Sequence, residues 1–295
     1  MAGSVTLRRG MEPEQENSRM ITERPAVRWI LTGLALGYLG LMLIIPLIAV
    51  FAKAFERGIE LYINAIVSAD ALSAIYLTLL TVAIAVPMNT VFGLAAAWAI
   101  AKFEFKGKNF LITLIDLPFA ISPVIAGLIF VFLFGKPGIF GPLLAAHDIK
   151  IIFAVPGIVL ATVFVTFPFV ARELIPLMES QGTAEEEAAL TLGANGWKTF
   201  WRVTLPNIKW GLIYGVILTS ARAVGEFGAV SVVSGHIRGF TNTLPLHVEI
   251  LYNEYQFTAA FAVASLMTLM AVVTLVVKNI VEWKVQQQGQ AAELE

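Results

Sequence analysis

The segment Thr183–Pro206 reads T-A-E-E-E-A-A-L-T-L-G-A-N-G-W-K-T-F-W-R-V-T-L-P and separates two long apolar runs of this chain. It contains three successive acidic residues, two glycines and a terminal Leu205-Pro206 pair. About 20 apolar residues are enough to cross the hydrocarbon core of a bilayer, and both flanking runs reach that length. We therefore expect a compact polar loop between two membrane spans, in a fold made of several such spans.

The composition of the whole chain agrees with a membrane protein. Apolar residues make up 58% of the 295 residues and charged residues only 14%, whereas about a quarter of a soluble domain is charged. The net charge of −1 gives no indication of nucleic-acid binding, and the absence of cysteine excludes disulfides, thiolate metal sites and cysteine nucleophiles. An integral membrane protein is the class that remains.

Charge-poor apolar runs predict an all-α protein with six transmembrane helices. The first run is too long to be the core of a signal peptide, so we expect a retained helix. The membrane domain then covers residues 29–280, with a flexible tail at 1–28 and a second tail at 281–295. The six runs are Trp29–Ala52, Ala71–Ala101, Phe110–Phe134, Ile151–Ala171, about Trp210–Ser234 and Phe257–Val277.

The distribution of lysine and arginine predicts the orientation of the chain in the membrane. If the N-terminus is inside, the inner segments carry 14 basic residues and the outer segments carry five. Inner segments of membrane proteins are the ones enriched in lysine and arginine. We therefore expect both termini and the polar loop at about 179–206 to be cytoplasmic, and the segments Gly135–Lys150 and Gly235–Gln256 to be external.

The polar loop has the features of a small helix-turn-helix. Thr183 and Glu186 have the spacing of a capping box, which predicts a helix that starts at Thr183. Gly193 stands where a left-handed cap would end that helix, and Leu205-Pro206 is expected to end the next short helix. Such a unit is stiff enough to transmit a movement from a partner protein to the membrane spans, as a coupling element must. The alternative is an ordinary amphipathic loop that lies on the membrane surface.

The same loop resembles the E-A-A-x-x-x-G-x9-[I/V]-x-L-P loop of permease subunits in binding-protein-dependent ABC importers. The resemblance implies a type I ABC importer permease-like fold, in which the loop is a cytoplasmic coupling helix between the fourth and fifth spans. It also implies that ATP and Mg are held by a partner ATPase, while this chain is non-catalytic and binds no cofactor. The residues that match the motif are Glu187, Ala188, Ala189, Gly193, Leu205 and Pro206.

Two spans contain candidate residues for an ion pathway. Arg222 and Glu226 lie four residues apart in the fifth run, which is helical same-face spacing. A charge at membrane depth is costly and faces a partner or a water-filled path. Arg222 and Glu226 therefore either form an ion pair that only packs two helices together, or Arg222 lends positive potential to an anion pathway while Glu226 holds its position. In the third run, Ser122 and Pro123 follow Pro118, which predicts a broken helix that is a gate, part of the pathway or a packing kink.

The block A-R-A-V-G-E-F-G-A at Ala221–Ala229 resembles the oxyanion branch of the same importers, and the segments Ser231–Gly239 and Thr243–Tyr255 resemble its sulfate/thiosulfate permeases of the W type. That resemblance implies a heterodimer with a homologous T-type permease in the bacterial inner membrane. It further implies two ATPase subunits and a periplasmic sulfate/thiosulfate-binding protein as partners.

Other functions stay open from the sequence. A molybdate/tungstate permease of the same family would work with two copies of itself. An ion-coupled secondary transporter would use carboxylates in its spans, for which Asp116 and Glu226 are the candidates, and it would have no need of a docking loop. A membrane protein with a structural or assembly role is the third alternative.

Overall fold

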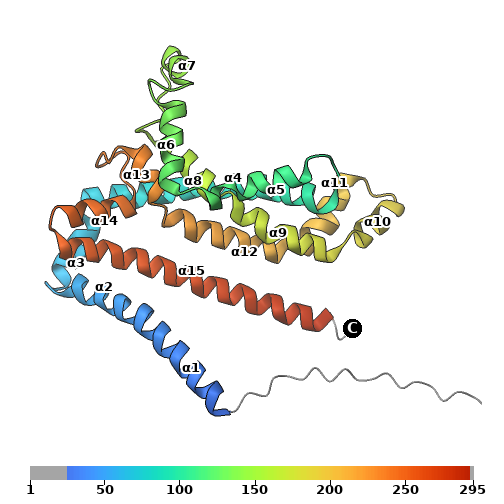
Figure 1. Ribbon diagram of the computed structural model, residues 1–295, viewed down its shortest axis with the longest axis horizontal. Coiled ribbons are helices and arrows are strands. Elements are labelled where there is room, and N and C mark those ends of the chain that lie inside the picture. The colour runs from blue at the N-terminus through green and yellow to red at the C-terminus, as the bar shows by residue number, and fades with distance from the viewer. Residues whose placement is uncertain (1–24, 293–295) are drawn as a thin grey trace, which may run out of the picture. The chain divides into compact units, whose positions relative to one another are not determined.

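The computed structural model describes residues 25–292, with side chains from 26 to 282. It divides into two parts, Met1–Ala49 and Val50–Glu295, and each is described by itself. Every regular element within the described range is a helix (Figure 1), which confirms the predicted all-α class. Residues 1–24 of the predicted N-terminal tail lie outside the described residues, whereas Pro25–Arg28 already belong to the first helix.

The first part holds the beginning of the first predicted span. Helix α1 (Pro25–Leu39) continues through a π-helical turn, η1 (Gly40–Ile44), into α2 (Ile45–Phe55). The stretch Ala26–Phe55 is long and apolar enough to cross a membrane. The predicted retained helix at Trp29–Ala52 is therefore present and is a few residues longer at each end.

Three further helical stretches in the second part are long and apolar enough to be spans. One is α4 (Ala69–Lys102), another is α8 (Val155–Thr166) with α9 (Pro168–Gln181), and the third begins α15 (Phe257–Ala292). A helix of 34 residues such as α4 is about 50 Å long, which exceeds a hydrocarbon core of about 30 Å. Helix α15 continues to Ala292, into the residues that we expected to form a C-terminal tail.

The remaining two predicted spans are bent pairs of helices. Helices α5 (Lys108–Ala120) and α6 (Pro123–Phe134) meet at 107°. The break falls at Ser122, whose extended backbone (φ −57°, ψ 133°) is what the following Pro123 favours. The helical stretch Gly196–Val224 and α13 (Gly228–Ser234) meet at 51°. The six-span prediction holds when each bent pair is counted as one span, and the predicted break at Ser122-Pro123 is confirmed.

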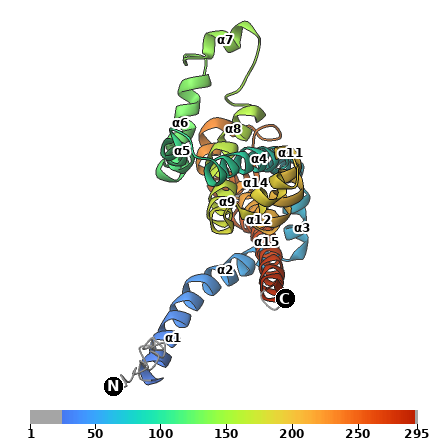
Figure 2. The same cartoon turned by 90° about the vertical axis from the view of Figure 1, so that its right-hand side faces the viewer.

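Helices α4, α9, α12 and α15 form a bundle with short helices at each of its two ends, while α6 and α7 project away from its side (Figures 1 and 2). We call these ends the α10 end and the α14 end. The α10 end carries α10 and α11, and the α14 end carries α3 and α14 (Figure 1). The bounds are α3 Ile59–Val67, α7 Gly141–Ala146, α10 Ala184–Thr191, α11 Gly196–Thr199, η2 Phe200–Thr204, α12 Leu205–Val224 and α14 Leu244–Asn253.

Helices α4, α9 and α12 form the frame that supports the α10 end. Their shared core contains Leu174, Met178 and Ile208, all fully buried. Gly93 lets α4 approach α9 closely, because a Cβ at that glycine would lie 2.8 Å from the Cβ of Val170. Dense packing of this kind resists deformation, so these three helices form a firm support for the α10 end.

Candidate functional site

The helix predicted to start at Thr183 is present, but its first turn is built differently. Helix α10 starts directly after Thr183. The capping box is wrong: Thr183 has nearly helical backbone angles, whereas a capping residue adopts an extended conformation. The Thr183 hydroxyl instead donates to Glu187 Oε1 at 2.7 Å, and Glu186 lies 2.8 Å from the ammonium of Lys102. A nearby cation thus draws Glu186 away from the backbone.

The far end of α10 has the predicted left-handed cap. Gly193 has φ +87°, its amide donates to the Leu190 carbonyl at 3.0 Å, and the Ala194 amide donates to the Ala189 carbonyl at 3.0 Å. These two bonds are the pair that defines a Schellman cap. No atom in the described part of the chain lies within 4 Å of the position that a Cβ would take at Gly193. The backbone turn, rather than tight packing, therefore requires this glycine.

The predicted helix end at Leu205-Pro206 is wrong. Asn195 caps α11 by accepting from the Lys198 amide at 2.8 Å, and from Gly196 the chain stays helical to Val224. Pro206 lies in the first turn of α12, directly after the π-helical turn η2, in which the Leu205 amide donates to the Phe200 carbonyl. The wider π turn accommodates the proline, which lacks an amide hydrogen. The loop is therefore continuous with the fifth span.

The α10 end exposes large apolar side chains on α10 and at the start of the helical stretch Gly196–Val224. Glu187 and Ala188 are exposed, and within the described range α10 has no buried residue. Large apolar side chains that are exposed together mark a surface that binds a protein partner or the membrane. The apolar side chains exposed on this loop are Leu190, Leu192, Trp197 and Trp201, and Leu192 has an exposed fraction of 89%.

The two charges of the fifth span are paired, as the spacing suggested. Arg222 Nη1 lies 2.6 Å from Glu226 Oε2. They do not share one helix, however, because α12 ends at Val224 and Glu226 lies in the bend before α13. Glu226 Oε1 accepts from the Ala229 amide at 2.9 Å, so the carboxylate holds the bend as well as the arginine. The Glu226 side chain is 1% exposed, whereas Arg222 is 34% exposed, which leaves the cation accessible.

The helix break at Ser122-Pro123 lies against the bend that carries Glu226. A Cβ at Gly228 would be 2.9 Å from the Cβ of Pro123, and a Cβ at Gly127 would be 2.8 Å from the Ala229 carbonyl oxygen. Only glycine fits at these two contacts. The structure therefore brings the breaks of the third and fifth predicted spans together, although they are about 100 residues apart in the sequence.

Sequence reasoning missed the partner of Asp116. Arg172 Nε donates to Asp116 Oδ1 at 2.7 Å, which joins α5 to α9. The Arg172 guanidinium also lies 5.3 Å from the centre of the Phe119 ring. The two charged residues are 56 positions apart, so no helical periodicity could have paired them. A carboxylate that is already paired with an arginine is poorly suited to bind a coupling cation.

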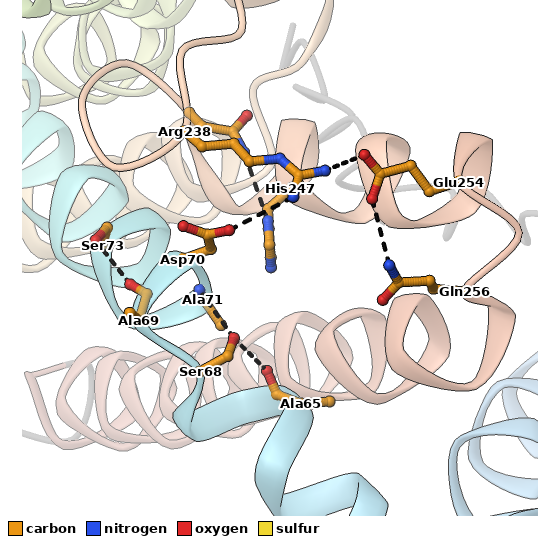
Figure 3. Close-up of polar contacts among 11 residues, drawn as sticks. Ala65, Ser68, Ala69, Asp70, Ala71, Ser73, Arg238, His247, Glu254 and Gln256 are labelled. Atoms are coloured by element: carbon orange, nitrogen blue, oxygen red, sulfur yellow. Dashed lines mark hydrogen bonds and ion pairs between the residues drawn. The ribbon is translucent and has the colours of Figure 1, made fainter.

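A second cluster that sequence reasoning missed lies at the α14 end (Figure 3). We call it the Arg238 cluster: Arg238 pairs with Glu254 and lies 3.6 Å from Asp70 Oδ2, in the first turn of α4. The hydrogen bond to Glu254 raises the pKa of Arg238, and the charges of Glu254 and Asp70 act in the same direction. His247 lies beside the cluster with 2% exposure, and burial lowers its pKa. The cluster ties the start of α4 to the loop that precedes α14 and to Glu254, which caps the end of α14.

Comparisons with known proteins give the family. Residues 89–286 match the family described as "Binding-protein-dependent transport system inner membrane component". The chain is 56% identical over 256 residues to the sulfate transport system permease protein CysW of Synechocystis sp., covering 87% of this chain and 93% of that one. It is 48% identical to CysW of Escherichia coli K12 over 268 residues (91% and 92% coverage). It is 37% identical to CysT of the same organism over 233 residues (79% and 84% coverage).

A solved structure shows the same fold. A chain of a bacterial alginate ABC transporter, in complex with a periplasmic protein that holds an alginate pentasaccharide, aligns with a TM-score of 0.71 at 20% identity. The alignment covers 87% of this chain and 93% of that chain, which confirms the predicted type I importer permease fold. The chain therefore belongs to the family of inner membrane components of binding-protein-dependent transport systems.

Proposed function

We propose that this chain is the W-type permease subunit of an ATP-driven importer of sulfate or thiosulfate. Its identity to the CysW proteins, 56% and 48%, exceeds its identity to CysT, 37%. The geometric observation that supports a coupled transporter is the helical stretch Gly196–Val224. It links the exposed 179–206 loop directly to the Arg222–Glu226 bend of the fifth span.

The proposed role of the 179–206 loop is to dock into one of two ATPase subunits that hold ATP and Mg. Leu192 and Trp197 supply exposed apolar area for that contact, and the exposed Ala188 lets a partner surface come close. Gly193 fixes the turn that separates α10 from α11. Glu187, Ala189, Leu205 and Pro206 complete the matched motif. In this proposal the chain is a conduit and a lever, and it catalyses no covalent step.

The proposed anion pathway passes the Arg222 guanidinium. A doubly charged anion interacts strongly with a cation where water is scarce, because the Coulomb energy scales inversely with the dielectric constant. Arg222 is one-third exposed while Glu226 is buried, so an anion could approach the cation without meeting the carboxylate. The Ser122-Pro123 break, which packs on the same bend, is the proposed gate.

The remaining parts of the proposal concern partners and orientation. We place the α10 end and both termini in the cytoplasm of a bacterium and the Arg238 cluster on the periplasmic side. A homologous T-type permease completes the pathway, and a periplasmic sulfate/thiosulfate-binding protein delivers the anion. The 14-to-5 distribution of basic residues supports this orientation.

The test is uptake of radiolabelled sulfate by a strain that lacks this chain and by the same strain complemented with it. Loss of uptake on deletion, restored by the parental chain and inhibited by excess thiosulfate but not by molybdate, is the expected result. Unchanged sulfate uptake in the deletion strain, with no paralogue compensating, would refute the assignment. Co-purification of two identical copies without a second permease would favour a molybdate importer, and uptake that continues without an ATPase would favour a secondary transporter.

A further inference from the structure

Helix α10 is joined to the rest of the protein through polar contacts, and its ion pair with Lys102 is largely enclosed. Lys102 is the last residue of α4, and its ammonium lies 2.8 Å from Glu186 Oε1 in α10. The side chain of Lys102 is 6% exposed and that of Glu186 is 17% exposed. An exposed ion pair contributes little, whereas loss of one partner from an enclosed pair leaves a charge without compensation.

Lys102 joins four elements at one point. It also donates to the carbonyl of Gly182, the residue that ends α9. Its partner Glu186 accepts from the Thr204 hydroxyl in η2 at 3.2 Å. The end of α4 is therefore fixed at once to the end of α9, to α10 and to the π turn that leads into α12.

Helix α10 has a second attachment that does not involve Lys102. Asn207, in the first turn of α12, donates to Glu185. If the Lys102 contact were lost, α10 would still be held to α12 but no longer to α4. The two attachments can therefore be separated by substitution.

Helix α4 runs from the α10 end, where Lys102 lies, to the α14 end of the bundle. It is helical over all 34 residues, although Pro87 inside it removes one backbone hydrogen bond, and Asp70 in its first turn belongs to the Arg238 cluster (Figure 3). A helix whose two ends are held by ion pairs to other elements can pass an axial displacement from one end to the other. The partners at its two ends are α10 and the segment around Arg238.

We propose that Lys102 is a positioning residue for transport: through Glu186 it passes movements of α10 into α4, and α4 carries them to the Arg238 cluster. This inference rests on the proposed docking of the 179–206 loop onto an ATPase. The helix α12 then delivers the movement to the Arg222–Glu226 bend, while Lys102 delivers it to the face that receives the anion.

The experiment measures ATP hydrolysis and sulfate uptake per assembled complex in proteoliposomes. Lys102→Met is expected to keep assembly and hydrolysis while uptake per ATP falls about tenfold, which lies within the range seen for residues that carry coupling. The double variant Lys102→Glu with Glu186→Lys restores the pair with reversed charges but not the bond to the Gly182 carbonyl, and it is expected to recover part of the uptake that Lys102→Met loses. The matched control is Lys108→Met, which removes a lysine from an exposed pair with Glu104 and is expected to behave as the parent.

A second readout does not depend on the identity of the anion. Phe240→Cys places a thiol on an exposed residue of the loop that carries Arg238, in a chain with no native cysteine. Addition of ATP is expected to change the rate at which that thiol is labelled. The change should disappear when Lys102→Met is added and should remain when Lys108→Met is added.

The outcomes separate the two proposals. Parental uptake per ATP in Lys102→Met would overturn the role of Lys102, and so would a charge-exchanged variant no better than Lys102→Met. An unchanged ATP response of the Phe240→Cys thiol in Lys102→Met would do the same. The parental complex could take up no sulfate while ATP still changes the labelling of the Phe240→Cys thiol, and only when Lys102 is present. That result would refute sulfate as the substrate and support the role of Lys102.

Discussion

Replacing Gly193 with valine would put a β-branched side chain on a residue with φ +87°. Since no atom of the described residues lies within 4 Å of the new Cβ, the cost comes from the left-handed backbone alone, about 1–2 kcal/mol. A cost of that size lowers the population of the capped loop by a factor of about 5–30. We expect the affinity of the membrane subunits for the ATPase to fall by the same factor, with membrane insertion preserved.

The assay is titration of the purified ATPase onto the permease pair in detergent or nanodiscs, followed by sulfate uptake in cells. Gly196→Val is the matched control, because Gly196 begins α11 in helical backbone and also has open space around it. Gly193→Asn should lose less than Gly193→Val, because asparagine tolerates the left-handed region. Equal affinities for the Gly193→Val and Gly196→Val variants would refute the reasoning.

Three further predictions concern charge, topology and pH. Replacing both Arg222 and Glu226 with glutamine should leave assembly intact, since a buried ion pair adds little net stability, but should slow uptake per complex; parental uptake would make Arg222 a packing residue. With single cysteines in spheroplasts, an impermeant thiol reagent should label the His147 position and spare the Asn195 position, and the reverse would overturn the orientation. Burial lowers the pKa of His247, so the unfolded state binds more protons as the pH falls below about 6.5 and stability decreases there. The melting temperature of the complex should fall from pH 7.5 to 5.5 more steeply in the parent than in His247→Gln, and parallel curves would exclude His247 as the cause.

The features that local rules govern could be predicted from the sequence. Apolar runs located the spans because a bilayer imposes a minimum length on each one. Ser122-Pro123 located a helix break, and Gly193 located a helix end, because proline and glycine restrict or widen the backbone angles of their own neighbourhood. These rules depend on adjacent residues, so a single sequence contains all that they require.

The features that were missed depend on residues far apart in the chain. The capping box failed because Lys102, 84 positions from Glu186, supplied a stronger partner than the backbone amide. The helix end predicted at Leu205-Pro206 is wrong because the π turn η2 accommodates the proline. No pattern in residues 200–204 predicts such a turn. The Arg238 cluster joins positions 70, 238 and 254, which only the packing of α4 against α14 brings together.

The π turn between the loop and the fifth span also absorbs a change of rotational phase. A π turn closes with i→i+5 bonds and takes about one residue more than an α turn, and each residue of an α-helix corresponds to about 100° around the axis. Because the extra residue of Phe200–Thr204 is absorbed within one revolution, deleting one residue there would convert the π turn to an α turn and leave Trp197 facing nearly the same way relative to Arg222. A one-residue deletion in the α-helical residues that follow would instead turn Trp197 by about 100°, so the direction of the docking surface tolerates a change of length only inside that five-residue segment.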